Sequence, residues 1–184
     1  GFTYIVNHGI APEVIERAFA ASRAFFLRPE AAKAEIAVDE INRGWMAMGR
    51  AKMTGAIRTD LKELFSWGLE LGPDDPEVVA GTPFRGPNQW PADQPEMRAA
   101  IYDGFYRAGC ATGARLLRAV CVGLGLAPDA LAPHFAKPMA RGQLIYYPPQ
   151  PPEMGEEQFG VAAHTDFGCL TLVCQDDCGG LQVQ

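Results

Sequence analysis

Apolar residues recur with helical spacing in the N-terminal half of the chain and with strand-like spacing in its last part. From Pro12 to Leu27 they fall on one face of a helix, and Pro12 can open that helix because its missing N–H is not needed in the first turn. The residue before a proline avoids helical geometry, so Arg28-Pro29 should end the helix. Pro29 can then open a second short helix that reaches Ile36.

A longer helical pattern begins near residue 95. Asp93 and Glu96 have the spacing of a capping box, in which the first side chain accepts from the helix and the second reaches back. The apolar ridge then runs to about Val122, and Gly123 ends it. One more short helix is expected from Pro128 to near His134.

Strand-like patterns surround these helices. Residues 1–10 predict a strand that turns at Asn7-His8-Gly9, and residues 40–72 have mixed, strand-like patterning. Residues 72–95 are rich in proline and predict a long, ordered surface loop, which at this length is expected to be functional or wrapped against the core. After Pro138, four short β-like runs are separated by Pro, Gly and Asp: GQLIYYPP, FGVAAH, GCLTLVCQ and GGLQVQ. The pattern therefore predicts an α+β chain without a linker between two domains.

The composition and charge argue against some classes of function. The chain has 184 residues, 48% of them hydrophobic, which is enough for one domain with a sizeable core. The net charge of −6 argues against nucleic acid, whose phosphates need clustered basic residues. Apolar runs are far shorter than the roughly 20 residues of a membrane span. The five cysteines lie mostly in apolar segments and are typical of the free thiols of a cytoplasmic protein.

The string AHTDFG, residues 163–168, contains the best candidate for chemistry. On an extended segment, His164 and Asp166 project to the same side with Cα atoms roughly 7 Å apart, while Thr165 points away. One nitrogen and one oxygen ligand can then converge on a single metal ion. This mixed pair suits Fe(II), and a further histidine would complete the facial triad of two His and one carboxylate. A polar turn without a metal is the alternative that the pair alone leaves open.

Four segments resemble one family, in the same order along the chain: GFTYIVNHGI, RGWMAMGRAKMTGAIRTDLKELFSWGLE, LIYYPPQPP and HTDFGCLTLVCQDDCGGLQV. They are similar to the 2-oxoglutarate- and Fe(II)-dependent dioxygenases, in the branch that includes isopenicillin N synthase. The resemblance spans nearly the whole chain. It implies a non-haem oxygenase that uses Fe(II), 2-oxoglutarate as co-substrate and O₂ to oxidise a small organic molecule, with formation of succinate and CO₂.

The resemblance also assigns residues. It implies that His164 and Asp166 are the first two iron ligands and that Tyr147 donates a hydrogen bond to a carboxylate of the co-substrate or substrate. Core packing is an equally good reading of Tyr147. The family has an asparagine where this chain has Ile145, so one polar contact near the co-substrate is absent.

The fold implied by the resemblance is an incomplete double-stranded β-helix, or jelly roll, with flanking N-terminal helices. Residues 1–95 correspond to the N-terminal dioxygenase region, and residues 96–184 to the long helix and the first part of the β-helix core. The second iron-binding histidine and an Arg-x-Ser strand come later in the family. We therefore expect a piece of a longer protein, or a truncated product, that is inactive alone and monomeric.

Three alternatives remain. An oxidase of the isopenicillin N synthase type would use no 2-oxoglutarate, and a degenerate member would bind without catalysis. A zinc module could use His164 with Cys174 and Cys178, although their spacing is wide for a structural zinc site. We expect structural roles for the two remaining histidines, His8 in a turn and His134 at the end of a helix. Core packing is expected for two apolar residues of the metal-bearing segment, Phe167 and Leu172.

Overall fold

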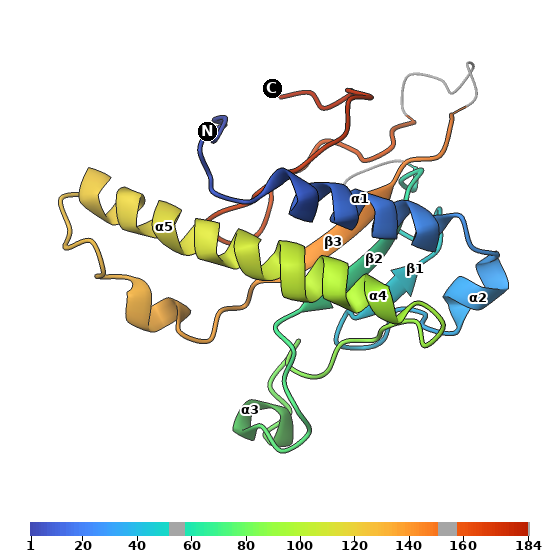
Figure 1. Ribbon diagram of the computed structural model, residues 1–184, viewed down its shortest axis with the longest axis horizontal. Helices are drawn as coiled ribbons and strands as arrows, with labels where there is room; N and C mark the ends of the chain where they lie inside the picture. Colours follow the sequence, from blue (N-terminus) through green and yellow to red (C-terminus); the bar gives the residue numbers. More distant parts are fainter. Residues whose placement is uncertain (52–57, 151–157, 184) are drawn as a thin grey trace.

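A computed structural model describes residues 1–51, 58–150 and 158–183 and shows helices packed on one face of a small antiparallel sheet. Helix α1 and the long helix labelled α4 and α5 both cross the same face of the sheet (Figure 1). The chain is thus an α+β protein, as predicted. Six residues of the second resembling segment and the two last prolines of LIYYPPQPP lie outside the described residues.

The helices follow the apolar periodicity of the sequence. Helix α1 spans Pro12–Phe26 and α2 spans Glu30–Ala34. The long helix is continuous but changes its winding, with α4 over Pro95–Arg98, a π-helical stretch η1 over Ala99–Tyr106, and α5 over Arg107–Gly123. The predicted helices at these positions are confirmed to within about two residues.

The predicted capping box is wrong. Gln94, not Asp93, precedes the first helical residue, and no side chain caps the helix start. The carboxylate of Asp93 instead binds Arg28, whose Nη2 lies 2.7 Å from Oδ1 and 2.5 Å from Oδ2. A full charge on the guanidinium competes better for a carboxylate than a backbone N–H does.

The sheet has the order β1-β2-β3, with strands Gly44–Met46, Glu63–Gly68 and Arg141–Tyr146. Every residue of the central strand β2 is buried. Trp67 pairs with Gly142, where a Cβ atom would overlap the ring carbon Cζ2 of the indole. The glycine therefore makes room for the indole and allows β3 to approach β2.

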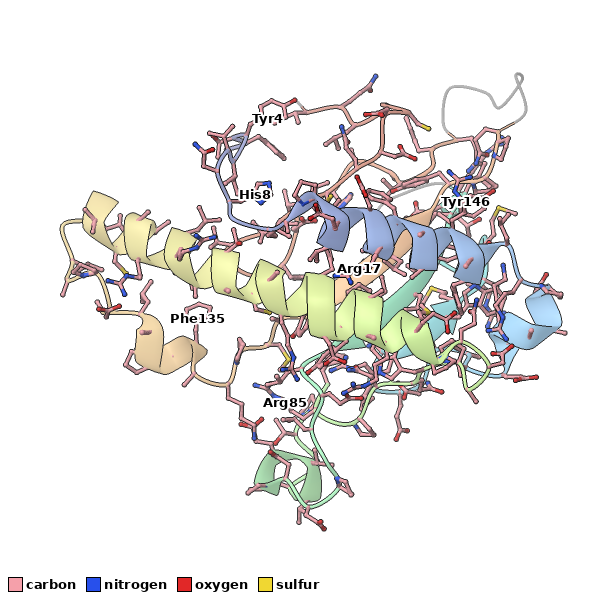
Figure 2. All side chains as sticks on the ribbon, in the orientation of Figure 1. Tyr4, His8, Arg17, Arg85, Phe135 and Tyr146 are labelled. Atoms are coloured by element: carbon pink, nitrogen blue, oxygen red, sulfur yellow. The ribbon has the colours of Figure 1, made fainter. Side chains whose placement is uncertain are left out.

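The core between sheet and helices is largely aromatic. Phe65 of β2 is fully buried and contacts Phe25 of α1, with ring centroids 5.1 Å apart. Tyr146 of β3 stacks on Phe26, the last residue of α1, with ring centroids 5.5 Å apart. Figure 2 labels Tyr146 near this end of α1. In the π-helical stretch, Tyr102 and Tyr106 stack at 5.0 Å and both point into this core.

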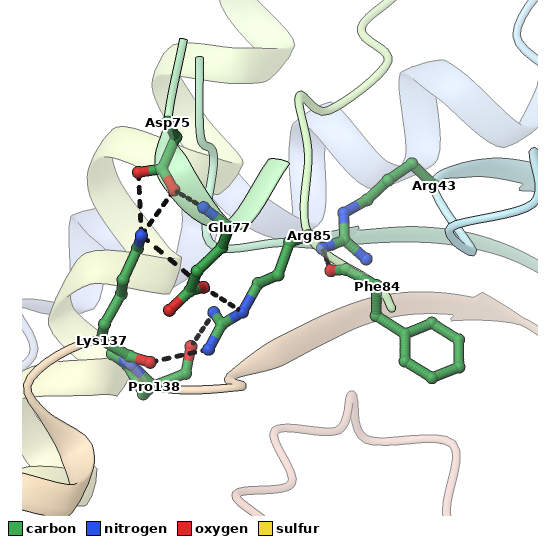
Figure 3. A network of polar contacts seen from close by, with 7 residues as sticks. All are labelled: Arg43, Asp75, Glu77, Phe84, Arg85, Lys137 and Pro138. Carbon is green, nitrogen blue, oxygen red and sulfur yellow. Dashed lines mark hydrogen bonds and ion pairs between the residues drawn. The ribbon is translucent and has the colours of Figure 1, made fainter. Parts of the chain in front are cut away.

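The proline-rich loop is tied to the start of β3 by a polar network (Figure 3). It contains the short helix α3, Pro76–Val79, and its Arg85 donates to the carbonyl oxygens of Lys137 and Pro138 at 2.9 and 3.0 Å. The Lys137 ammonium in turn lies 2.6 Å from Asp75 Oδ1. The loop is thus wrapped against the rest of the molecule, as its length suggested.

Two groups of predicted strands are wrong. Residues 1–10 form no strand, although the chain turns as expected at Asn7, whose φ is +55°. Residues 158–183 contain no helix or strand, and Phe167 and Leu172 are exposed instead of packed. A strand needs a neighbour for its N–H and C=O groups, and alternating apolar residues alone do not provide one. Among the described residues 158–183, the hydrogen bonds to the rest of the chain come from residues 158–162, which lead directly to the candidate site.

The predicted helix after Pro128 is shorter than expected, a 3₁₀ turn η2 over Ala132–Phe135. Among the described residues, no helix has both the length and the apolar character needed to cross a membrane.

Candidate metal centre

The segment that carries the predicted metal ligands is anchored beside the entrance to β2. Gln158 Nε2 donates to Thr59 O at 2.9 Å, and Leu61 N donates to Phe159 O at 3.1 Å. A third contact joins Ala162 N to a carboxylate oxygen of Asp60 at 3.2 Å. These three bonds connect residues about a hundred positions apart and fix the chain just before His164.

His164 and Asp166 are brought together as their spacing predicted. Nε2 of His164 lies 3.2 Å from Oδ1 of Asp166, and both side chains are partly open to solvent. The segment that holds them is not part of a strand, so the convergence comes from the local backbone conformation.

The other ring nitrogen of His164 determines the tautomer. Nδ1 lies 2.8 Å from the carbonyl oxygen of Ala162. Because a carbonyl oxygen can only accept, Nδ1 carries the hydrogen, and Nε2 of the neutral ring presents a lone pair. That lone pair faces the Asp166 carboxylate, which is also an acceptor. Two acceptors at this distance are favourable only when a proton or a cation lies between them.

The pair has the geometry of two neighbouring metal ligands. Two ligands at right angles, each about 2.1 Å from one ion, are about 3.0 Å apart. The distance of 3.2 Å between His164 and Asp166 is close to this value. The backbone carbonyl behind Nδ1 is also the usual second partner of a metal-binding histidine. The two residues therefore fit Fe(II), with His164 as nitrogen ligand and Asp166 as oxygen ligand.

A complete set of three ligands is not present in the described part of the chain, where no three His, Cys, Asp or Glu side chains converge. His8 and His134 lie elsewhere. Nδ1 of His8 accepts from Ile10 N at 3.1 Å within the N-terminal turn, and His134 belongs to the short turn η2.

The zinc arrangement gains no support. All five cysteines are free thiols. Burial raises the pKa of the Cys174 thiol, and a hydrogen bond with Asp176 raises that of Cys178. A structural zinc site needs converging ligands, and His164, Cys174 and Cys178 do not form such a group among the described residues.

Tyr147 lies against the same anchored segment. It follows β3 directly, and its ring packs so closely on Gly160 that a Cβ atom there would lie 2.7 Å from Cδ1. Strand alternation places Tyr147 on the side of Ile145, opposite to Tyr146 and the helices. Burial, together with the negative charge of Asp60, raises the pKa of the Tyr147 phenol, which keeps it a hydrogen-bond donor.

Two candidate functional residues were not predicted from the sequence. Asp60 and Lys62 are buried charged residues, 1% and 5% exposed, at the entrance to β2. Their alternation with apolar residues in DLKELF resembles the pattern of a half-exposed strand. Only the position of Ala162 in space reveals what the carboxylate binds.

Known proteins of one family resemble this chain. Residues 1–93 match the family described as "non-haem dioxygenase in morphine synthesis N-terminal". The whole chain matches 54% of a 2-oxoglutarate-Fe(II) type oxidoreductase, hxnY, of Emericella nidulans at 33% identity, and 57% of a 2-oxoglutarate-dependent dioxygenase, citB, of Monascus ruber at 34% identity. The chain thus spans about half the length of the curated relatives it matches.

Solved structures give the same result. A full-length Neurospora crassa protein, determined by crystallography in complex with alpha-KG, superposes with a TM-score of 0.71 and 27% identity, covering 88% of this chain and 50% of that one. A 2OG-Fe(II) oxygenase family protein of Caulobacter crescentus superposes with a TM-score of 0.68 and 27% identity, covering 79% of this chain and 46% of that one.

Proposed function

Because the chain belongs to the non-haem dioxygenases, within the superfamily of 2-oxoglutarate- and Fe(II)-dependent oxygenases, we propose that the complete protein oxidises a small organic substrate with O₂. The oxidation is coupled to decarboxylation of 2-oxoglutarate to succinate and CO₂. The observation that carries this proposal is the pair His164 and Asp166, with Nε2 and Oδ1 facing each other at 3.2 Å.

In this proposal each residue has a defined task. Bound Fe(II) supplies the activation of O₂ and the oxidising power. His164 presents Nε2 because Ala162 O holds its Nδ1–H, and Asp166 adds a negative charge that offsets part of the metal charge. Tyr147 donates its phenol hydrogen to a carboxylate of the co-substrate. Its raised pKa keeps that hydrogen in place.

The rest of the site lies outside this chain in the proposal. A facial triad needs one more histidine, and the relatives have room for it in the half of their length that the chain does not cover. We place β1, β2 and β3 in a double-stranded β-helix that this other half completes. The isolated chain, with an incomplete ligand set, is then inactive.

We also propose the compartment and the oligomeric state of the protein. Five free thiols are typical of a reducing compartment, so we place the protein in the cytoplasm. We propose that it acts as a monomer on a small molecule.

The test is formation of succinate from 2-oxoglutarate by the complete protein with Fe(II) and ascorbate, without added substrate. We expect succinate from the wild type and from His134→Ala, a control histidine outside the site. His164→Ala should reduce it to the background of the metal alone. Equal rates for wild type and His164→Ala would contradict the proposal.

An oxidase that uses no 2-oxoglutarate is the second candidate, favoured by Ile145 at the position where the family has asparagine. It would consume O₂ in the presence of its substrate and form no succinate. Measuring O₂ consumption and succinate formation in the same reaction distinguishes the two functions.

A further inference from the structure

A buried ion pair lies directly behind the candidate metal centre. Nζ of Lys62 is 3.1 Å from Oδ2 of Asp60, and both side chains are almost fully buried. Removing two charges from water is costly, and the cost is offset only when the charges are paired and hydrogen-bonded in good geometry. Oδ2 accepts no hydrogen bond from the described residues, so Lys62 acts on the carboxylate through its charge, at 3.1 Å.

The second oxygen of Asp60 points toward the site. Oδ1 accepts from Ala162 N at 3.2 Å, while the backbone N–H of Asp60 donates to Ala51 O at 2.9 Å. The carboxylate thus has one oxygen for Lys62 and one for the segment that leads to the ligands. A hydrogen bond to a charged acceptor is about twice as strong as a neutral one.

Ala162 connects this carboxylate to His164. Its N–H donates to Asp60, and its carbonyl oxygen accepts from Nδ1 of His164 at 2.8 Å. The position of Ala162 therefore sets the acceptor that fixes both the ring orientation and the tautomer of the histidine.

We propose that Asp60 is a positioning residue of the metal centre, which holds His164 through Ala162 and is itself oriented by Lys62. The inference rests on the proposed function, since it assigns His164 to a metal. Nothing in this chain of contacts requires Asp60 to touch the metal or the substrate.

Asparagine at position 60 gives the sharpest test. Its side chain has one carbonyl oxygen and one NH₂ group, whereas Lys62 Nζ and Ala162 N–H are both donors. In Asp60→Asn one of these donors must face the NH₂ group. Adding Lys62→Met removes one donor and leaves the carbonyl oxygen free for Ala162. Removing the second charge also relieves the unpaired ammonium, so the stability of the protein should recover whatever the role of Asp60. A positioning role predicts in addition that Co(II) affinity and the His164 tautomer recover, because position 60 can again accept the hydrogen bond from Ala162 N.

The experiment compares Asp60→Asn, Asp60→Asn/Lys62→Met and Asp60→Ala in the complete protein. Glu63→Gln is the matched control, since it disrupts the neighbouring buried pair with Lys33 and makes no contact with Ala162. The first readout is the dissociation constant of Co(II), used in place of Fe(II) and titrated without co-substrate. The second is the ¹⁵N shift of the His164 ring in the metal-free protein, which reports the tautomer.

We expect Asp60→Ala and Asp60→Asn to weaken Co(II) binding roughly 10–100-fold, the range typical for partners behind metal ligands. In both, the His164 ring should become a mixture of tautomers. The double variant should recover most of the affinity, and Glu63→Gln should keep both properties of the wild type.

The inference is overturned if the Asp60 variants keep the wild-type tautomer and Co(II) affinity, or lose no more affinity than Glu63→Gln. If Asp60→Ala does not fold, the single and double asparagine variants decide. Neither readout requires turnover. A protein that forms no succinate but shows these effects would contradict the proposed function and leave the positioning role intact.

Discussion

Lys33 and Glu63 form an ion pair in the core, with Nζ of the lysine 2.7 Å from Oε2 of the glutamate. The same oxygen accepts from Trp45 Nε1 at 2.6 Å, and the lysine also donates to Phe26 O. The pair therefore joins helix α2 to strands β1 and β2 on the side of the sheet that packs against the helices.

Removing one charge of this pair should be more damaging than removing both. We expect Lys33→Met to lower the free energy of unfolding of the complete protein by about 3–5 kcal/mol, because it leaves a buried carboxylate without its cation. Lys33→Met/Glu63→Leu should cost less than Lys33→Met alone. Urea unfolding measures both, and a double variant less stable than the single one would show that the charges contribute independently.

Glycine at position 142 should be required by the indole of Trp67. Gly142→Ala places a methyl group in overlap with Trp67 Cζ2, so either the ring or strand β3 must move. We expect a loss of about 1–3 kcal/mol, as for other overpacked cores. Thermal unfolding measures the change.

Gly109 and Gly113 supply the control for this substitution. Both lie in helix α5, and an added methyl group at either position would have no neighbouring atom within 4 Å. Alanine there should stabilise the helix by about 0.5–1 kcal/mol, because it restricts the unfolded chain. If Gly142→Ala behaved like these two, close packing against Trp67 would not be the reason for the glycine.

The sequence predicted the elements whose partners are near in the chain. The period of apolar residues located α1 and the long helix. His164 and Asp166 lie side by side as expected, although the segment that holds them is not the expected strand. The strands expected after residue 158 failed because a strand depends on a neighbour that local spacing does not specify. Asp60 was missed for the same reason, since its partner Ala162 is 102 positions away.

The network around Arg85 should control how tightly the proline-rich loop holds the start of β3. Arg85→Met removes the donors to Lys137 O and Pro138 O and the ion pair with Glu77, at 2.8 Å from Nε. We expect faster amide hydrogen exchange in residues 72–90 and around residue 138, with little change in helix α1. Arg17→Met, a substitution in α1 outside the network, is the control, and hydrogen exchange read by mass spectrometry is the measurement. Equal protection in both variants would contradict a role of Arg85 in anchoring the loop.

Tyr106 should make the fold sensitive to alkaline pH. Burial, followed by the nearby Cys110, raises the pKa of its phenol far above the usual value, and its hydroxyl donates to Ala140 O at 2.8 Å. The unfolded chain loses this proton near pH 10, whereas the folded protein keeps it. Above about pH 10 the unfolded state therefore binds fewer protons, and stability should fall by about 1.4 kcal/mol per pH unit for this group.

Below pH 10 the phenol is protonated in both states, and its contribution is fully present. Tyr106→Phe should remove this part of the alkaline slope while costing stability at neutral pH through the lost hydrogen bond to Ala140. Tyr4→Phe, at a side chain that is 97% exposed, should leave the slope as it is. Unfolding free energies measured from pH 8 to 11 distinguish the two variants. An unchanged slope in Tyr106→Phe would assign the alkaline sensitivity to other groups.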